Sequence, residues 1–173
     1  MCRAHYARWR RGAALDVEIS TRHQTPEESF LARIEPLAWS SCLVWMGAID
    51  SGGHYGQVSI GGKLVAAHRY AWERVNGPVP AGMFVDHTCW VRSCVNVEHL
   101  RLATRAQNNR NRQGASRNSR TGVRGVRPRR GGYEAQVRCH GTSRSKHFKT
   151  LDAAAEWAAE TRLEMYGEYA GGD

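Results

Sequence analysis

The stretch Val85-Asp-His-Thr-Cys-Trp-Val-Arg-Ser-Cys-Val-Asn-Val-Glu-His-Leu100 decides what kind of fold the chain can form. Among its side chains that can bind a metal or carry a proton are Asp86, His87, Cys89, Cys94, Asn96 and His99. Thiolate, imidazole and carboxylate groups are common metal ligands, and a neutral imidazole is also a general base near neutral pH. The stretch therefore predicts a metal site with a base beside it.

The residues around this stretch predict a strand, a turn and the start of a helix. Met83-Phe84-Val85 is an apolar run suited to a buried strand. Asn96 is an N-cap candidate, because its side chain can accept from the unpaired N–H groups of a first helical turn. A hairpin folded back onto that turn would bring Asp86 and His99 together on one hard or borderline divalent cation. His87 would point away from them and be free to act as a base.

The order Asp-His, then Asn, then His resembles the HNH nuclease motif, which belongs to the ββα-metal fold of homing and restriction endonucleases. The resemblance covers about residues 40 to 112 and includes Cys42–Trp45, Tyr55-Gly56, Ala67–Glu73, Gly77–Gly82, Leu102–Thr104 and Gln107–Asn109. It implies a homing-type, metal-dependent DNA endonuclease whose products carry 5′-phosphate and 3′-hydroxyl ends. In that interpretation Asp86 and His99 hold Mg2+ or Mn2+, His87 deprotonates the attacking water, and Asn96 holds the hairpin in register.

The cysteines suggest a second metal. Cysteines at close spacing in an intracellular chain favour metal ligation over disulfides, and a structural zinc site needs four ligands. Cys89 and Cys94 supply two, and Cys42 and His68, both within the part that resembles the nuclease family, are the candidates for the others. A small hairpin would gain stability from such a metal. The alternative is that Cys42 and Cys89 are small buried residues and His68 is a core or DNA-facing histidine.

The flanking sequence predicts further elements of the nuclease domain. Gln57–Ile60 alternates polar and apolar residues and precedes Gly61-Gly62, which predicts one arm of a hairpin. Residues 66–75 predict a helix that stops before Gly77-Pro78. Thr104-Arg-Ala-Gln107 is a capping box that starts another helix.

Positive charge is concentrated in one segment. The formal net charge is +9, yet residues 101–149 hold fourteen Lys or Arg against one acid, Glu134. Lys and Arg laid on phosphates release condensed counterions, so the segment predicts binding to a polyanion. Together with the resemblance to the nuclease family, it implies double-stranded DNA as the partner. The alternative is a solvated surface. The residues expected to contact DNA are Arg105, Asn108, Arg110, Arg112, Arg124, Arg127, Arg129, Gln136, Arg138, Arg144, Lys146 and Lys149.

The C-terminal part predicts a separate small domain. Short strands are expected over residues 122–127, 133–138 and 146–149, and a helix over 152–166 whose Ala154, Ala155, Ala158 and Leu163 cover one face of the sheet. The free face would present Arg124, Arg127, Gln136, Arg138 and Lys146. Gly122-Val-Arg-Gly-Val-Arg, Tyr133-Glu-Ala-Gln-Val, Lys146-His-Phe-Lys-Thr and Leu151-Asp-Ala-Ala-Ala-Glu-Trp-Ala are similar to the plant ethylene-response (APETALA-type) DNA-binding domain. The resemblance implies a sheet that lies in the major groove, with arginines on bases and phosphates.

The expected fold class is α+β, a ββα-metal nuclease domain followed by a three-stranded antiparallel sheet packed on one helix. The expected segments are an N-terminal extension with a short helix that starts at Pro26 (1–39), the nuclease domain (40–112), a basic linker (113–121) and the sheet-plus-helix domain (122–170). No apolar run reaches membrane length and no signal-peptide segment is present, so a cytoplasmic protein is expected, plausibly encoded by a phage or mobile element. Two alternatives are an inert sequence-specific DNA-binding regulator and a zinc-stabilised nucleic-acid-binding module.

Overall fold

The computed structural model describes residues 25–52 and 55–172. The chain divides into two units, residues 1–33 and 34–173. In the first unit, helix α2 (Pro26–Leu31) begins where the sequence predicts it, after Thr25, whose side chain forms a capping box with Glu28. Residues 1–24 of the predicted N-terminal extension lie outside the described residues.

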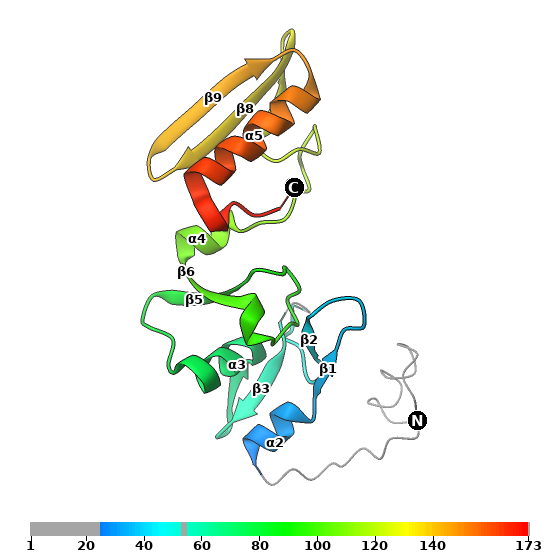
Figure 1. The fold of residues 1–173 in the computed structure, drawn as a ribbon, viewed down its shortest axis with the longest axis vertical. Coiled ribbons are helices and arrows are strands. Elements are labelled where there is room, and N and C mark those ends of the chain that lie inside the picture. Colours follow the sequence, from blue (N-terminus) through cyan, green and yellow to red (C-terminus); the bar gives the residue numbers. More distant parts are fainter. Residues whose placement is uncertain (1–24, 53–54, 173) are drawn as a thin grey trace. The chain divides into compact units, whose positions relative to one another are not determined.

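The first part of the second unit is built from three antiparallel strand pairs (Figure 1). They are β1 (Ile34–Pro36) with β2 (Leu43–Trp45), β3 (Gln57–Ile60) with β4 (Lys63–Ala66), and β5 (Met83–His87) with β6 (Leu100–Thr104). The predicted hairpin arm at Gln57–Ile60 and its glycine turn are confirmed. Strand β1 falls within the segment expected to be an N-terminal extension.

Helix α3 (Ala67–Asn76) follows β4 without a break. It ends at Gly77, which has a φ of 81°, a backbone conformation that glycine adopts without strain. This confirms the helix predicted before Gly77-Pro78. Ala67 and Ala71 are buried on α3, and Trp45 of β2 is buried as well. These residues contribute to the small apolar core beneath the β5–β6 hairpin.

The β5–β6 hairpin and the helix after it form a ββα arrangement. The connection between the strands ends in a single 3-10 turn, η1 (Val97–His99), and Asn96 caps it by accepting from the Glu98 N–H (3.1 Å). The turn is short because Leu100 already belongs to β6. Helix α4 (Arg105–Arg110) then starts at the Thr104 capping box, as the sequence predicts.

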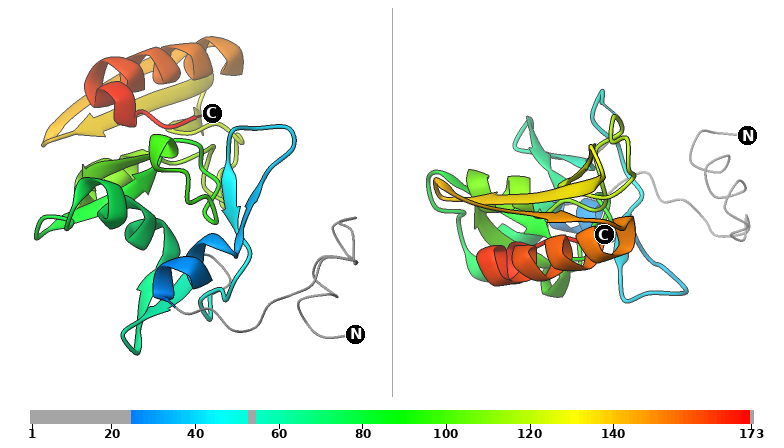
Figure 2. Two further views of the ribbon diagram at one scale, coloured as in Figure 1. Left: turned by 60° about the horizontal axis from the view of Figure 1, so that its bottom comes forward. Right: turned by 90° about the horizontal axis from the view of Figure 1, so that it is seen from above.

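The C-terminal part is a three-stranded antiparallel sheet covered on one face by a helix (Figure 2). The strands are β7 (Val126–Arg129), β8 (Gly132–Cys139) and β9 (Thr142–Phe148), followed by α5 (Leu151–Tyr166) and the 3-10 turn η2 (Gly167–Tyr169). Val126 and Ala135 of the sheet pack with Ala154 and Ala158 of α5. Small side chains at these positions let the helix lie close to the sheet.

Three details of this sheet differ from the prediction. The first strand starts at Val126 rather than Gly122, because Gly122 and Gly125 have φ angles of 69° and 78° that interrupt a strand. Lys146 is paired with Ala135 and therefore stands on the helix side of the sheet, not on the free face. Leu163 is 65% exposed and does not cover the sheet.

None of the helices in the described part of the chain combines the length and hydropathy that a membrane-spanning helix needs.

Gly56 is predicted to be essential to the packing of Trp45. A Cβ at position 56 would overlap the indole ring of Trp45, which is only 3% exposed. Gly56→Ala should lower the free energy of unfolding by about 1–3 kcal/mol, the usual cost of overpacking a core. Urea unfolding measures this, with Ser59→Ala on the exposed side of β3 as the control. Equal stability of Gly56→Ala and the wild type would contradict the packing.

Candidate functional site

Three cysteines and one histidine form a compact cluster. The ligand atoms of Cys42, Cys89, Cys94 and His99 all lie within 4.8 Å of one another. Nδ1 of His99 is 3.5 Å from Sγ of Cys42 and 3.6 Å from Sγ of Cys94. Four sulfur and nitrogen donors at this spacing match a four-coordinate structural metal site.

Backbone pairing brings these distant residues together. Val44 of β2 pairs with Cys94, and Val95 N–H donates to the Leu43 carbonyl (2.7 Å), so the segment after Cys42 runs beside the loop that carries Cys94. Asn96 strengthens this junction, because its Nδ2 donates to the carbonyl of Ser41 (2.8 Å). Asn96 thus caps η1 and ties it to the segment that carries Cys42.

Burial also affects the protonation of two thiols of the cluster. It raises the pKa of Cys89 to about 12 and likewise raises the pKa of Cys94. Both thiols are therefore protonated at neutral pH. Because a metal binds the thiolate form, metal uptake at this cluster releases protons and contributes directly to folding stability.

The structure completes the cluster with His99, whereas the sequence suggested His68. The η1 turn directs Nδ1 of His99 to the sulfur atoms, and its Nε2 lies 2.9 Å from Oγ of Ser41. Both ring nitrogens therefore have neighbours, and the expected sharing of one cation by His99 and Asp86 stays a prediction. His68 instead stands at the start of α3, with its ring centroid 4.8 Å from that of His87.

Asp86 and His87 lie at a second place, an open polar pocket of about 760 Å³. They end strand β5 and are nearly buried, at 6% and 7% exposure. The pocket is lined by Tyr55, Asp86, His87, Trp90, Arg92, Asn108, Asn109, Asn111, Arg112 and Gln113. Carboxylate, imidazole, amide and guanidinium groups thus converge on one cavity.

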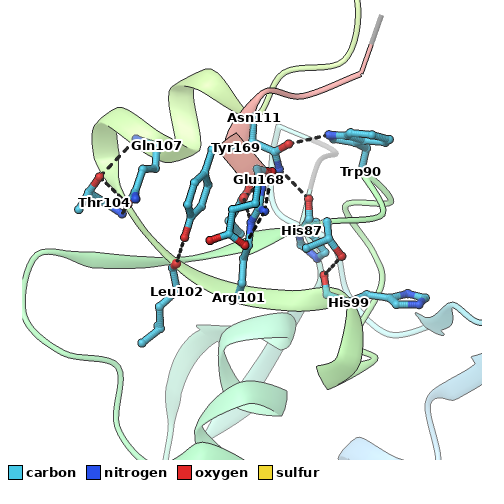
Figure 3. Close-up of polar contacts among 12 residues, drawn as sticks. His87, Trp90, His99, Arg101, Leu102, Thr104, Gln107, Asn111, Glu168 and Tyr169 are labelled. Atoms are coloured by element: carbon cyan, nitrogen blue, oxygen red, sulfur yellow. Dashed lines mark hydrogen bonds and ion pairs between the residues drawn. The ribbon is translucent and has the colours of Figure 1, made fainter. Parts of the chain in front are cut away.

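Two donors hold the Asp86 carboxylate. Arg101 Nε donates to Oδ2 (3.1 Å) and Asn111 Nδ2 donates to the same oxygen (2.8 Å). Asn111 Nδ2 also donates to the His87 carbonyl (2.8 Å), and its Oδ1 accepts from Trp90 Nε1 (3.0 Å) (Figure 3). Among the described residues, both bonds to the carboxylate end on Oδ2, which leaves Oδ1 as the oxygen available to a cation.

The imidazole of His87 is held in one orientation. Its Nε2 lies 3.0 Å from the carbonyl oxygen of Cys94. A carbonyl can only accept, so Nε2 carries the proton and Nδ1 has the free lone pair. Burial lowers the pKa of His87, although the Cys94 carbonyl and the charge of Asp86 act in the opposite direction. The neutral imidazole is therefore the prevailing form at neutral pH, as a general base requires.

Some of the residues expected to contact DNA are bound to the protein itself. The Arg124 guanidinium donates to three backbone carbonyls, those of Arg110, Arg112 and Ala170 (2.6–2.9 Å). Arg110 Nη1 lies 3.1 Å from Nε2 of His140. These side chains fix the segment after α4 in place.

The remaining candidates are at the surface or in the pocket. Arg127 and Arg129 both form ion pairs with Glu134 on the free face of the sheet, and Arg144 pairs with Glu164. Gln136 donates to Ser143 (3.1 Å). Asn108 and Arg112 line the pocket, and Arg105, Arg138, Lys146 and Lys149 are exposed. Contact of these residues with DNA stays a prediction.

Sequence reasoning missed Arg101, Asn111 and Trp90 as parts of the site. Arg101 faces Asp86 directly across the β5–β6 pair, so the strand register could have revealed it. Asn111 and Trp90 carry no comparable signal, because their contacts depend on how the chain leaves α4 and turns after β5.

Comparison with known proteins agrees with this geometry. The HNH endonuclease family model matches residues 65–110. That range contains Asp86, His87 and three of the four cluster residues. The match to this family points to nuclease activity, metal dependence and a nucleic-acid substrate. No solved structure matches the chain.

Three curated relatives are phage proteins. Protein 7.7 of Escherichia phage T7 is 43% identical over 67 residues, which cover 39% of this chain and 51% of that protein. The gene 5.3 protein of Enterobacteria phage T3 is 54% identical over 33 residues, 19% of this chain and 33% of that protein. Protein 3.8 of phage T7 is 28% identical over 110 residues, 62% of this chain and 90% of that protein. The chain thus spans about half of Protein 7.7 and a third of the gene 5.3 protein.

The cluster geometry predicts which histidine binds its metal. His99→Ala should reduce the metal-to-protein ratio of the purified chain from about one to well below one, because a three-ligand site loses affinity. His68→Ala should keep the ratio of the wild type. Plasma mass spectrometry after gel filtration measures both. If His68→Ala lost the metal while His99→Ala kept it, the result would support the ligand set expected from the sequence, in which His68 binds the metal with the three cysteines.

Burial of His68 predicts a dependence of stability on pH. Burial, with the nearby His87 and Arg69, lowers the pKa of His68 from 6.5 to about 3. Between these values the unfolded chain binds a proton that the folded chain does not, so stability falls as the pH drops below about 6.5. His68→Phe should show a shallower loss than the wild type in urea unfolding between pH 7.5 and 5. Identical slopes would contradict the buried neutral imidazole.

Proposed function

We propose that the protein is an HNH-type DNA endonuclease that hydrolyses phosphodiester bonds to 5′-phosphate and 3′-hydroxyl ends. The observation that carries this proposal is the pair Asp86 and His87 at the end of β5. Both residues line one pocket of polar side chains, and Nδ1 of His87 carries the free lone pair. A base next to an oxygen ligand is the arrangement that hydrolysis of a phosphodiester by water needs.

The pocket fits Mg2+ or Mn2+ by the chemistry of its donors. Both ions prefer oxygen ligands and keep several waters. Asp86 supplies a carboxylate oxygen, and the amides of Asn108 and Asn109 supply neutral oxygens from the same cavity. We therefore propose that these amide oxygens, and not His99, join Asp86 as ligands of the Mg2+ or Mn2+ ion. A cation here supplies Lewis-acid stabilisation of the charge that develops on the phosphate and the leaving oxygen.

The remaining groups of the pocket have roles that follow from their charge. His87 Nδ1 accepts the proton of the attacking water while its Nε2–H stays on the Cys94 carbonyl. Arg92 and Arg112 line the same cavity and can bind non-bridging phosphate oxygens. The orientation of the base is fixed before substrate binds, which lowers the barrier without a reorganisation cost.

We further propose that the cluster of Cys42, Cys89, Cys94 and His99 holds a structural Zn2+. Three thiolates and one imidazole are a usual zinc ligand set. Cys94 supplies both a sulfur to the cluster and the carbonyl that orients His87. Zinc would therefore support the catalytic base as well as the fold.

Double-stranded DNA is the proposed partner, bound by the basic segment from Arg105 to Lys149. The free face of the C-terminal sheet presents Arg127, Arg129, Gln136 and Arg138, as the resemblance to the ethylene-response domain would require. A homing-type enzyme needs such a second recognition surface, because a nuclease pocket that contacts one phosphate carries little sequence information.

Plasmid cleavage tests the proposed function. With Mg2+ or Mn2+, the wild type should convert supercoiled DNA to nicked or linear form, and His87→Ala should be slower by about 10²–10⁴-fold, the range for loss of a general base. Ser59→Ala, at an exposed position of β3 outside the basic segment, is the control and should cut like the wild type.

Cleavage by His87→Ala at the rate of the wild type would overturn the assignment of the base. If neither protein cuts but both shift DNA in a gel, the chain is an inert DNA-binding regulator built on a nuclease scaffold.

A further inference from the structure

The segment that follows α5 returns to the nuclease hairpin. We define the C-terminal tail as residues Gly167–Gly172, which include η2. Arg101 Nη1 donates to the Glu168 carbonyl (2.8 Å), and the Arg101 guanidinium carbon lies 4.0 Å from the centre of the Tyr169 ring. Tyr169 Oη donates to the Leu102 carbonyl (2.9 Å). Figure 3 shows Glu168 and Tyr169 beside Arg101 of β6.

These contacts act on the Asp86 carboxylate through one intermediate residue. Arg101 faces Asp86 across the hairpin, and its Nε holds Oδ2 at 3.1 Å. The Arg101 side chain is only 15% exposed, so its ion pair is poorly screened. The tail therefore restrains the Arg101 guanidinium, which in turn restrains Asp86, the proposed metal ligand.

A second route leads from the tail to the same carboxylate. A Cβ added to Gly172 would lie 3.1 Å from Cη2 of Trp90, so the tail packs against this indole ring. Trp90 Nε1 donates to Asn111, and Asn111 donates to both Asp86 and the His87 carbonyl. The tail thus contacts one donor of the Asp86 carboxylate, Arg101, directly and the other, Asn111, through Trp90.

The tail itself is fitted to this position. Arg124 Nη1 bridges the carbonyls of Ala170 (2.9 Å) and Arg112 (2.8 Å). Gly171 has a φ of 72°, and a Cβ there would overlap the Arg112 carbonyl oxygen. Only glycine allows the two backbone segments to approach so closely. The path of the tail is therefore set by its sequence as well as by α5.

We propose that the C-terminal tail is a positioning element of the nuclease site, which fixes the Asp86 carboxylate through Arg101 and through the Trp90–Asn111 pair. This inference rests on the proposed function, because it takes Asp86 as the metal ligand of the nuclease pocket. Partners behind a metal ligand typically change metal affinity or activity by about 10–100-fold. The C-terminal domain is then needed for the chemistry as well as for DNA binding.

The test compares Tyr169→Leu and Gly171→Ala with the wild type in the full chain. Mn2+ binding, followed by electron paramagnetic resonance, should weaken by about tenfold in both variants. The cleavage rate at saturating Mn2+ should also fall, while DNA affinity measured without added Mn2+ or Mg2+ should stay within about twofold of the wild type. Asp86→Asn identifies the fraction of Mn2+ signal that belongs to this site.

Gly141→Ala is the matched control for backbone strain. Gly141 has a φ of 81° in the β8–β9 turn, with nothing close to an added Cβ, so the substitution strains the C-terminal sheet without touching the tail. It should bind Mn2+ like the wild type. Tyr169→Phe keeps the ring over Arg101 and loses only the bond to Leu102, so it should lie between the wild type and Tyr169→Leu.

Two outcomes would overturn the inference. The first is wild-type Mn2+ affinity in both Tyr169→Leu and Gly171→Ala. The second is equal weakening in Gly141→Ala, which would show a general loss of stability. If the wild type binds Mn2+ at Asp86 but cuts no DNA, the proposed function fails, while the Mn2+ comparison still decides the role of the tail.

Discussion

The hydrogen bond from His87 Nε2 to the Cys94 carbonyl, 3.0 Å long, is the interaction on which the site depends. It assigns the proton to Nε2 and leaves Nδ1 free. The carbonyl is itself fixed, because Cys94 is fully buried, pairs with Val44 of β2 and contributes its sulfur to the Cys3His cluster. A loop with few apolar side chains can hold a carbonyl this firmly only if other bonds replace a core, and the proposed metal would supply them. The Cys3His cluster and the orientation of His87 therefore depend on the same residue, Cys94.

Burial of charge gives the second constraint on the site. A carboxylate that is nearly excluded from water is costly unless donors surround it, and Asp86 meets this requirement through Arg101 and Asn111. Each donor must in turn be held, or the carboxylate would move with it. The backbone of Glu168 and the ring of Tyr169 hold the first donor, and Trp90 holds the second. The requirement for fixed partners thus extends from the hairpin to the end of the chain, which explains why a segment remote in sequence belongs to the site.

The sequence predicted the local elements better than the long-range contacts. The hairpin arm at Gln57–Ile60, the helix that ends before Gly77 and the capping box at Thr104 depend on neighbours in the chain, and each is confirmed. The sequence did not show that His99, rather than His68, lies with the three cysteines. The direction of the His99 ring depends on whether Asn96 starts a long helix or a single 3-10 turn. The contacts of Arg124 escaped prediction for a related reason. Its basic charge suggests phosphate, but only the fold shows the three carbonyls that it bonds.

The arginines expected to bind DNA fall into two groups that differ in how readily phosphate can reach them. Arg124, in the first group, is held by three backbone carbonyls, and its release would leave those acceptors without partners, so it is structural. Arg127 and Arg129 lie on the exposed face of the sheet and share Glu134, whose pKa their hydrogen bonds lower to about 2. Exposed ion pairs are weak in water, and a phosphate is an equivalent acceptor. Glu134 can therefore keep both guanidinium groups extended over the free face until DNA takes its place. Under the proposed function, the sheet would need no rearrangement to bind DNA, and its affinity for phosphate would depend on salt in the way that an exchange of one anion for another demands.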